Sequence, residues 1–162
     1  MIETERYSRI STPGDRDMYV ERIFDATRDR VWDAYTMPEQ ISQWWGRGNR
    51  VTIEKMELKR GGHWRYVEYS SSGNGALVNG FEGRYREVTP KDRIVRTFEW
   101  DGMPGYVSIE STTFVDLGDG RTKVLNTLQC FTPEERDGMM GSGMERGMND
   151  SYAALDAFLA KS

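Results

Sequence analysis

The sequence predicts an α+β domain in which a curved antiparallel sheet of about seven strands wraps round one long C-terminal helix. Three observations support this fold class. Apolar and polar residues alternate from residue 50 to residue 131, as they do in half-buried strands. Turn residues divide this region at hairpin spacing. After residue 132 the apolar positions recur every three or four residues, as on one face of a helix.

The chain is expected to form one domain. Its 162 residues can bury a sizeable core, and no linker separates two such regions. Residues 1–16 are polar and contain the turn signal Pro13-Gly14-Asp15, so we expect a polar N-terminal arm followed by a single domain over residues 17–162. The first strand of that domain is predicted at residues 18–24.

Two short helices are predicted after the first strand. Thr27 is a suitable N-cap for a helix over residues 28–36. Thr36 can cap the second helix, whose first turn accommodates Pro38 because proline needs no backbone N–H partner there. Trp44 and Trp45 end this second helix, where they either pack on the sheet or cover a pocket.

Six further strands and the long helix complete the fold. The expected strands are 50–58, 62–70, 78–89, 92–100, 106–117 and 121–131. Consecutive strands at this spacing form an antiparallel meander, and the first strand pairs with it. Thr132 followed by Pro133 marks the start of one helix running to residue 160. Its apolar stripe must be buried against the sheet.

Composition excludes several functional classes. The formal net charge is −4 and the isoelectric point is about 5.2, so no basic surface is available for nucleic acid. No apolar stretch is long enough to span a membrane. Cys130 is the single cysteine, which rules out an intramolecular disulfide and favours a reducing compartment. We therefore expect a soluble cytoplasmic protein, and a homodimer is compatible with the predicted fold.

Ordered motifs along most of the chain resemble the START-like, or helix-grip, superfamily. They are Phe24-Asp25-Ala26-Thr27 before Val31-Trp32, Pro38-Glu39 before Trp44-Trp45, Gly61-Gly62-His63-Trp64-Arg65, Phe81-Glu82-Gly83-Arg84-Tyr85, Pro90 before Arg93-Ile94-Val95, Gly120-Arg121-Thr122, and residues 142–148 leading to Leu155. Within the superfamily, the chain resembles bacterial stand-alone proteins related to the C-terminal domain of the activator of heat-shock-protein-90 ATPase. The resemblance implies a hydrophobic pocket beneath the long helix. Relatives bind lipids, sterols or hormones, and some cyclise or dehydrate polyketides.

The expected site is a ligand pocket between the sheet and the helix, with no catalytic residue, metal or cofactor assigned. The predicted lining residues are Trp45, Trp64, Tyr66, Tyr85, Arg96, Phe98, Thr113, Asn126, Leu128, Met140, Met144 and Met148. Aromatic side chains supply large apolar walls, and methionines adapt to irregular space. The expected partner is a small apolar or amphipathic molecule.

Two polar residues fall on the predicted inner face. Arg96 shares a side of its strand with Phe98, and a buried guanidinium needs a partner. Glu110, a ligand carboxylate or a ligand phosphate could serve; otherwise a shifted register would leave Arg96 in solvent. Asn126 must also be hydrogen-bonded if it is buried, either to Thr113 or to a ligand.

Other reactive residue types have less specific interpretations. His63, the single histidine, alternates with Trp64 and is expected on the outer face, with general-base catalysis as the alternative. Cys130 is expected to be a buried, inert thiol rather than a nucleophile. Several acids lie on the predicted strands, and most of them are expected to be solvated on the outer face; the strand acids are Glu54, Glu57, Glu68, Glu82, Glu99 and Glu110.

The predicted long helix combines methionines with an unusual density of glycines at positions 138, 141, 143 and 147. Each helical glycine costs roughly 1 kcal/mol relative to alanine, so the glycines require an explanation. Three explanations of the glycines remain open: close approach of the helix to the sheet, a bend that opens the pocket, and ordinary core packing with a late helix start.

Three functions follow from the predicted pocket and the resemblance. The first is binding of a small hydrophobic or amphipathic ligand. The second is an enzyme of the polyketide cyclase, aromatase or dehydratase type, which needs a convergent acid–base pair inside the same pocket. The third is an interaction module that activates a chaperone ATPase.

Overall fold

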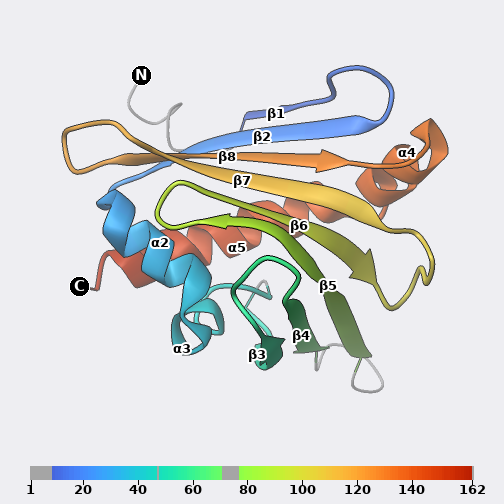
Figure 1. Ribbon diagram of the computed structural model, residues 1–162, viewed down its shortest axis with the longest axis horizontal. Helices are drawn as coiled ribbons and strands as arrows, with labels where there is room; N and C mark the ends of the chain where they lie inside the picture. The colour runs from blue at the N-terminus through green and yellow to red at the C-terminus, as the bar shows by residue number, and fades with distance from the viewer. Residues whose placement is uncertain (1–8, 47, 71–76, 162) are drawn as a thin grey trace.

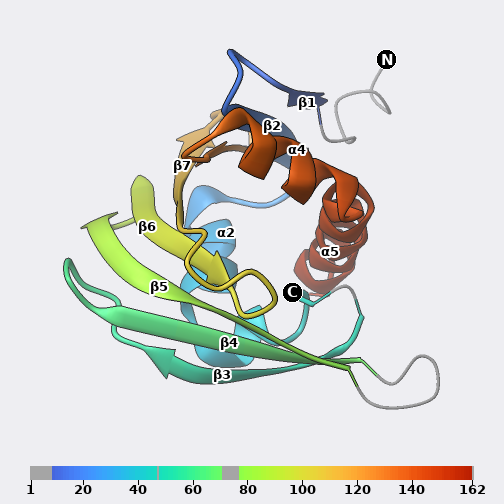
Figure 2. The same cartoon turned by 90° about the vertical axis from the view of Figure 1, so that its right-hand side faces the viewer.

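An eight-stranded antiparallel sheet curves round the C-terminal helix α5 in the computed structural model, which describes residues 9–46, 48–70 and 77–161 (Figures 1 and 2). The strands are β1 (Arg9–Ser11), β2 (Asp17–Phe24), β3 (Arg50–Met56), β4 (His63–Ser70), β5 (Leu77–Thr89), β6 (Arg93–Trp100), β7 (Ser108–Asp116) and β8 (Thr122–Gln129). Their order across the sheet is β1-β2-β8-β7-β6-β5-β4-β3. The predicted helix-grip α+β fold is confirmed. The strand beyond the predicted seven is β1, which pairs with β2 from within the expected polar arm.

The two short helices are α2 (Arg28–Thr36) and α3 (Pro38–Ile41), which lie together at one end of the sheet (Figure 1). Thr27 caps α2 as predicted, because its Oγ1 accepts a hydrogen bond from the Arg30 amide at 3.3 Å. The predicted cap of α3 is wrong. Thr36 is still helical within α2, so its hydroxyl reaches back and donates to the Trp32 carbonyl at 2.7 Å. Met37 occupies the capping position of α3 without a side-chain hydrogen bond.

Replacing Thr27 with alanine should lower the free energy of unfolding by about 1 kcal/mol, since it removes the acceptor for one unpaired amide of the first turn of α2. Urea denaturation followed by circular dichroism measures the change. The matched control is Thr36→Ala, which removes a hydroxyl that only duplicates a helical backbone interaction and should change stability by less than about half as much. Equal losses for the two variants would contradict the assignment of Thr27 as the cap.

The C-terminal helical region is divided in two, so the prediction of one uninterrupted helix is wrong. α4 (Pro133–Gly141) and α5 (Met144–Leu159) are separated by Ser142 and Gly143. Gly143 has a φ of +84°, a left-handed conformation that terminates a right-handed helix and that glycine adopts without steric cost. Figure 2 shows α5 nearly end-on and α4 from the side, so the chain turns sharply between them. The predicted cap at Thr132 is confirmed by the hydrogen bond from the Glu135 amide at 3.2 Å.

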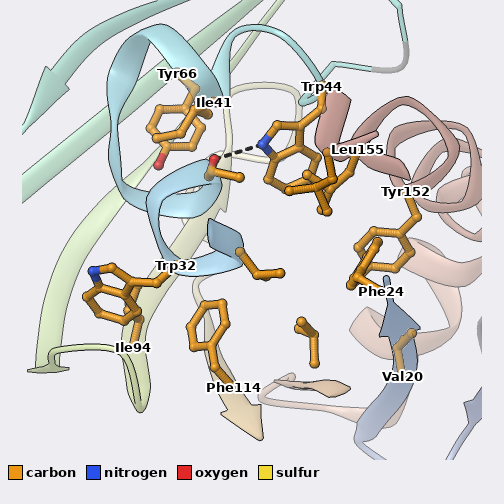
Figure 3. Close-up of a cluster of buried hydrophobic side chains, with 14 of the residues drawn as sticks. Val20, Phe24, Trp32, Ile41, Trp44, Tyr66, Ile94, Phe114, Tyr152 and Leu155 are labelled. Carbon is orange, nitrogen blue, oxygen red and sulfur yellow. Dashed lines mark hydrogen bonds between the residues drawn. The ribbon is translucent and has the colours of Figure 1, made fainter. Parts of the chain in front are cut away.

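The main hydrophobic core fills one end of the space between the sheet and α5 (Figure 3). Phe24 of β2 packs edge-on against Tyr152 of α5, with ring centroids 5.7 Å apart. Trp44 is buried and its indole N–H donates to the Ala34 carbonyl of α2 at 2.8 Å, the dashed line in Figure 3. This packing fixes α2, α3 and α5 against the strands.

A second, smaller core lies under α4 at the other end. Met18, Leu128 and Cys130 are buried there, and methionines of α4 and α5 pack against them. Along the edges of the sheet, β1 contributes three described residues, and the register of β3 against β4 shifts between Ile53 and Lys55. Among the described residues, no helix is both long and apolar enough to cross a membrane.

Candidate functional site: the cavity between the sheet and the C-terminal helices

A cavity of about 600 Å³ lies between the two cores, bounded by the concave face of the sheet, the α2–α3 end, and helices α4 and α5. Most of its wall is apolar and aromatic. Trp45, which follows α3, contacts Tyr66 of β4 and Phe81 of β5 edge-on at centroid distances of 5.3 and 5.0 Å. Met144 and Met148 of α5 line the opposite side. The cavity has the size and lining typical of small-molecule sites, which occupy roughly 300–1,000 Å³.

A polar cluster lies on the sheet side of this apolar space. The Nε of Arg96 on β6 donates to Oε1 of Glu110 on β7 at 2.7 Å, and another guanidinium nitrogen contacts the Tyr66 hydroxyl at 3.2 Å. The Asn126 amide donates to Thr112 Oγ1 at 2.9 Å and to Glu110 Oε2 at 3.3 Å. The side chains of Arg96 and Glu110 are only 13% and 18% exposed. Their mutual neutralisation allows both charges to stay in a largely apolar site.

Strand register explains why these residues meet. Arg96 pairs directly with Glu110 across β6 and β7, and Asn126 pairs with Thr112 across β7 and β8. Side chains of directly opposed residues project to the same face. The alternation that places Phe98 inward therefore also brings Arg96 inward, as the sequence predicted. The cluster is thus built from neighbouring central strands of the sheet.

The Arg96 guanidinium is held as a cation from several directions. Burial by itself lowers its pKa, but the Glu110 carboxylate and the Tyr66 and Tyr85 hydroxyls more than offset that effect, and the pKa is raised above its usual value. The guanidinium carbon also lies 3.8 Å from the Trp64 ring centroid, a cation–π contact. Arg96 is therefore engaged both at its edge and on its face.

Three tyrosine hydroxyls surround the cluster and remain protonated. Burial is the main cause that raises the pKa values of Tyr35, Tyr85 and Tyr152 well above their usual range. The Tyr85 hydroxyl is buried and makes no hydrogen bond of regular geometry within the described chain, although the Tyr66 hydroxyl and Arg96 lie near enough to influence its pKa. The Tyr35 hydroxyl is likewise buried without such a partner among the described residues. Both tyrosines line the cavity.

Glu68 is a cavity residue that the sequence analysis missed. It is 1% exposed, lines the cavity from β4, and accepts hydrogen bonds from Asn49 at 3.2 Å and from Asn79 at 3.5 Å. It is an exception to the expectation that most strand acids are solvated. The available signal was its alternation with Trp64 and Tyr66, because residues two apart on a strand share a face.

Most of the predicted lining residues surround the cavity. Trp45, Tyr66, Tyr85, Arg96, Phe98, Asn126, Met144 and Met148 line it. Leu128 and Met140 instead line a much smaller space beside Met18, next to the second core. Trp64 is fully buried behind Arg96, and its indole donates to the Thr97 carbonyl at 3.1 Å, so it does not reach the cavity surface. Binding roles for all of these residues remain predictions.

Thr113 was placed on the wrong face. It alternates with the inward-facing Thr112 and Phe114, so its side chain lies on the outer side of the sheet. The expected hydrogen bond between Asn126 and Thr113 is therefore replaced by the bond to Thr112. The error is one residue of register, which reverses the face of a strand position.

His63 and Cys130 occupy different environments. His63 lies on the outer face, where its Nε2 is 3.5 Å from Glu82 Oε2, and it is remote from the cavity lining. Cys130 is 8% exposed and lines the cavity next to α4. Burial, followed by the nearby Glu135, raises the pKa of Cys130, so the thiol form is favoured over the nucleophilic thiolate. Within the described ranges, no group of histidine, cysteine or acidic side chains could hold a metal ion.

A family model supports the architecture. The model described as "Activator of Hsp90 ATPase homolog 1-like protein" matches residues 25–160, which include every cavity-lining strand and helix described above. The comparison with curated proteins gave no match.

Solved structures of the same shape come from several bacteria. A protein from Rhodobacter sphaeroides is 26% identical with a TM-score of 0.84, and the alignment covers 96% of this chain and 99% of that one. A protein from Arthrobacter aurescens has a TM-score of 0.83 at 20% identity, with 95% and 92% covered. CalU16 from Micromonospora echinospora has a TM-score of 0.61 at 21% identity, with 96% and 85% covered. These likenesses establish the helix-grip fold.

Proposed function

Because the chain belongs to the Activator of Hsp90 ATPase homolog 1-like family, within the START-like superfamily, we propose that it binds a small hydrophobic or amphipathic molecule in the cavity between the sheet and helices α4 and α5. The observation that carries the proposal is the cavity itself. Its volume of about 600 Å³ suits a small molecule, and its wall is dominated by aromatic and methionine side chains. The break between α4 and α5 supports it further, because a turn at Gly143 lets the two helices border the space without filling it.

The neutral fluorophore N-phenyl-1-naphthylamine tests this proposal. Its emission rises in apolar surroundings, so titration with the purified protein should give a saturable increase at one site per chain. Replacing Met148 with tryptophan places a larger side chain in the cavity and should weaken binding at least about tenfold.

The matched control is Met37→Trp, the same change at a residue that is 38% exposed and outside the cavity lining. This variant should bind the fluorophore as the wild type does. Absence of saturable binding by the wild type, or equal binding by the two variants, would refute the proposal.

An enzymatic role is the alternative, and the cluster of Arg96, Glu110 and Tyr85 is where it would reside. Convergent polar groups in an apolar cavity are a common feature of catalytic sites. The tyrosines, whose pKa values are raised, could donate protons or hydrogen bonds but could not serve as bases near neutral pH. Activation of a chaperone ATPase rests on the family description alone, and no described contact favours it.

A further inference from the structure

Acidic side chains outnumber basic ones among the described residues that line the cavity. Arg96 is paired with Glu110, Glu68 is hydrogen-bonded to Asn49 and Asn79, and Glu135 adds a further carboxylate. Arg22, which influences the neighbouring Tyr152, is itself paired with Asp156. A ligand anion entering the cavity would therefore meet acidic neighbours and an arginine that already has a carboxylate partner.

Arg96 already has a carboxylate partner and contacts on its edge and on its face. Its Nε is bound to Glu110, another nitrogen contacts Tyr66, and the Trp64 ring covers its face at 3.8 Å. A ligand carboxylate that took the place of Glu110 on Arg96 would leave Glu110 with the Asn126 amide as its remaining hydrogen-bond donor among the described residues. Leaving a carboxylate buried without its cation is strongly unfavourable.

The cavity wall also carries a neutral hydrogen-bond donor close to the Tyr66 hydroxyl and Arg96. The Tyr85 side chain is 2% exposed and lines the cavity, and its hydroxyl lacks a regular hydrogen bond to any described residue. A buried hydroxyl without a partner is costly, and an acceptor supplied by a ligand removes that cost. A phenol hydroxyl can donate a hydrogen bond to an uncharged acceptor, and no cation is needed for this interaction.

We propose that the cavity selects uncharged ligands that carry a hydrogen-bond acceptor such as a ketone carbonyl, bound by Tyr85, and rejects carboxylates of the same size and shape. The inference rests on the proposed ligand-binding function and adds the chemical class of ligand. The sequence had left a ligand carboxylate or phosphate on Arg96 open; the pairing with Glu110 argues against both.

Two probes of nearly the same shape test the inference: 2-acetonaphthone, a neutral ketone, and 2-naphthoate, an anion at pH 7.5. Isothermal titration of the wild-type protein should show at least about tenfold tighter binding of the ketone. Equal or tighter binding of the acid would overturn the inference. Binding of N-phenyl-1-naphthylamine without binding of the ketone would also overturn it while leaving the ligand cavity in place. Failure of all three probes would remove the proposed function as well.

Replacing Glu110 with glutamine should abolish the preference for the ketone, because it releases Arg96 to the ligand and removes one negative charge. We expect the affinity for 2-naphthoate to rise at least about tenfold. The matched control is Glu82→Gln, the same charge change at an outer-face residue that binds Arg65 and is 37% exposed. It should leave the preference unchanged. Loss of the preference in both variants, or in neither, would contradict a specific role for Glu110; should Glu110→Gln fail to fold, the wild-type comparison decides the question.

Removing the Tyr85 hydroxyl tests the loss of a hydrogen-bond donor without any change in charge. Tyr85→Phe should weaken ketone binding about threefold to tenfold and leave naphthoate binding unchanged. Tyr69→Phe is the control, because Tyr69 lies outside the cavity lining and its ring is covered by Arg50 at 4.2 Å. Unchanged ketone binding by Tyr85→Phe would overturn the assignment of this hydroxyl.

Discussion

Replacing Arg96 with methionine should lower the free energy of unfolding by about 3 kcal/mol, because it leaves Glu110 as a buried carboxylate without its cation. This value is at the lower end of the range for broken buried pairs, since the two side chains retain 13% and 18% exposure beside a cavity. Methionine is an unbranched apolar side chain that can still cover the Trp64 ring, on which the guanidinium of Arg96 lies. Guanidinium chloride unfolding, monitored by tryptophan fluorescence, measures the loss.

The double variant Arg96→Met with Glu110→Leu provides the control. It removes both charges, so most of the lost stability should return. A double variant that is less stable than Arg96→Met alone would show that the loss comes from packing around Arg96 rather than from the uncompensated charge of Glu110.

Replacing Trp64 with alanine should lower the free energy of unfolding by about 3–5 kcal/mol, which is the second large effect that we expect. Trp64 is fully buried, packs against Tyr66 and Phe98 at centroid distances of 4.8 and 5.9 Å, and donates to the Thr97 carbonyl. Alanine would leave a large void, remove the hydrogen bond to the Thr97 carbonyl, and remove the ring beneath Arg96.

Trp45→Ala is the matched control for this substitution. Trp45 is only partly buried and borders the cavity, so its removal enlarges an existing space and should cost less than half as much stability. The same denaturation experiment compares the two variants. Equal losses would contradict the distinction between a packed core residue and a cavity-wall residue.

The sheet could be predicted well from the sequence because its strands alternate clearly. The same alternation that buries Trp64 and Tyr66 places His63 and Arg65 outside, as expected. Arg96 and Phe98 were correctly placed inside for the same reason. Alternation within a strand fixes which residues share a face, and that information is local.

The pairing between strands was harder to predict because it depends on register. Thr113 was chosen as the partner of Asn126, whereas Thr112 is the residue directly opposite. Glu68 was grouped with strand acids that were mostly expected in solvent, although its position on β4 puts it on the inner face. Its burial depends on Asn49 and Asn79, which come from other segments of the chain.

The hydrophobic periodicity also could not predict that the C-terminal region is divided into two helices. Met140, Met144 and Met148 keep a helical spacing across the break, so the apolar pattern continues where the backbone does not. Only the positive φ of Gly143 reveals the turn. As a result, Met140 packs in the second core whereas Met148 borders the cavity.

The outer strand β3 is a poor template for a strand from another molecule. Its register against β4 shifts beside the charged Glu54 and Lys55. Irregular pairing and charge both discourage the edge-to-edge addition that produces fibrils and strand-exchanged assemblies. This edge of the open sheet is therefore expected to resist aggregation by strand addition.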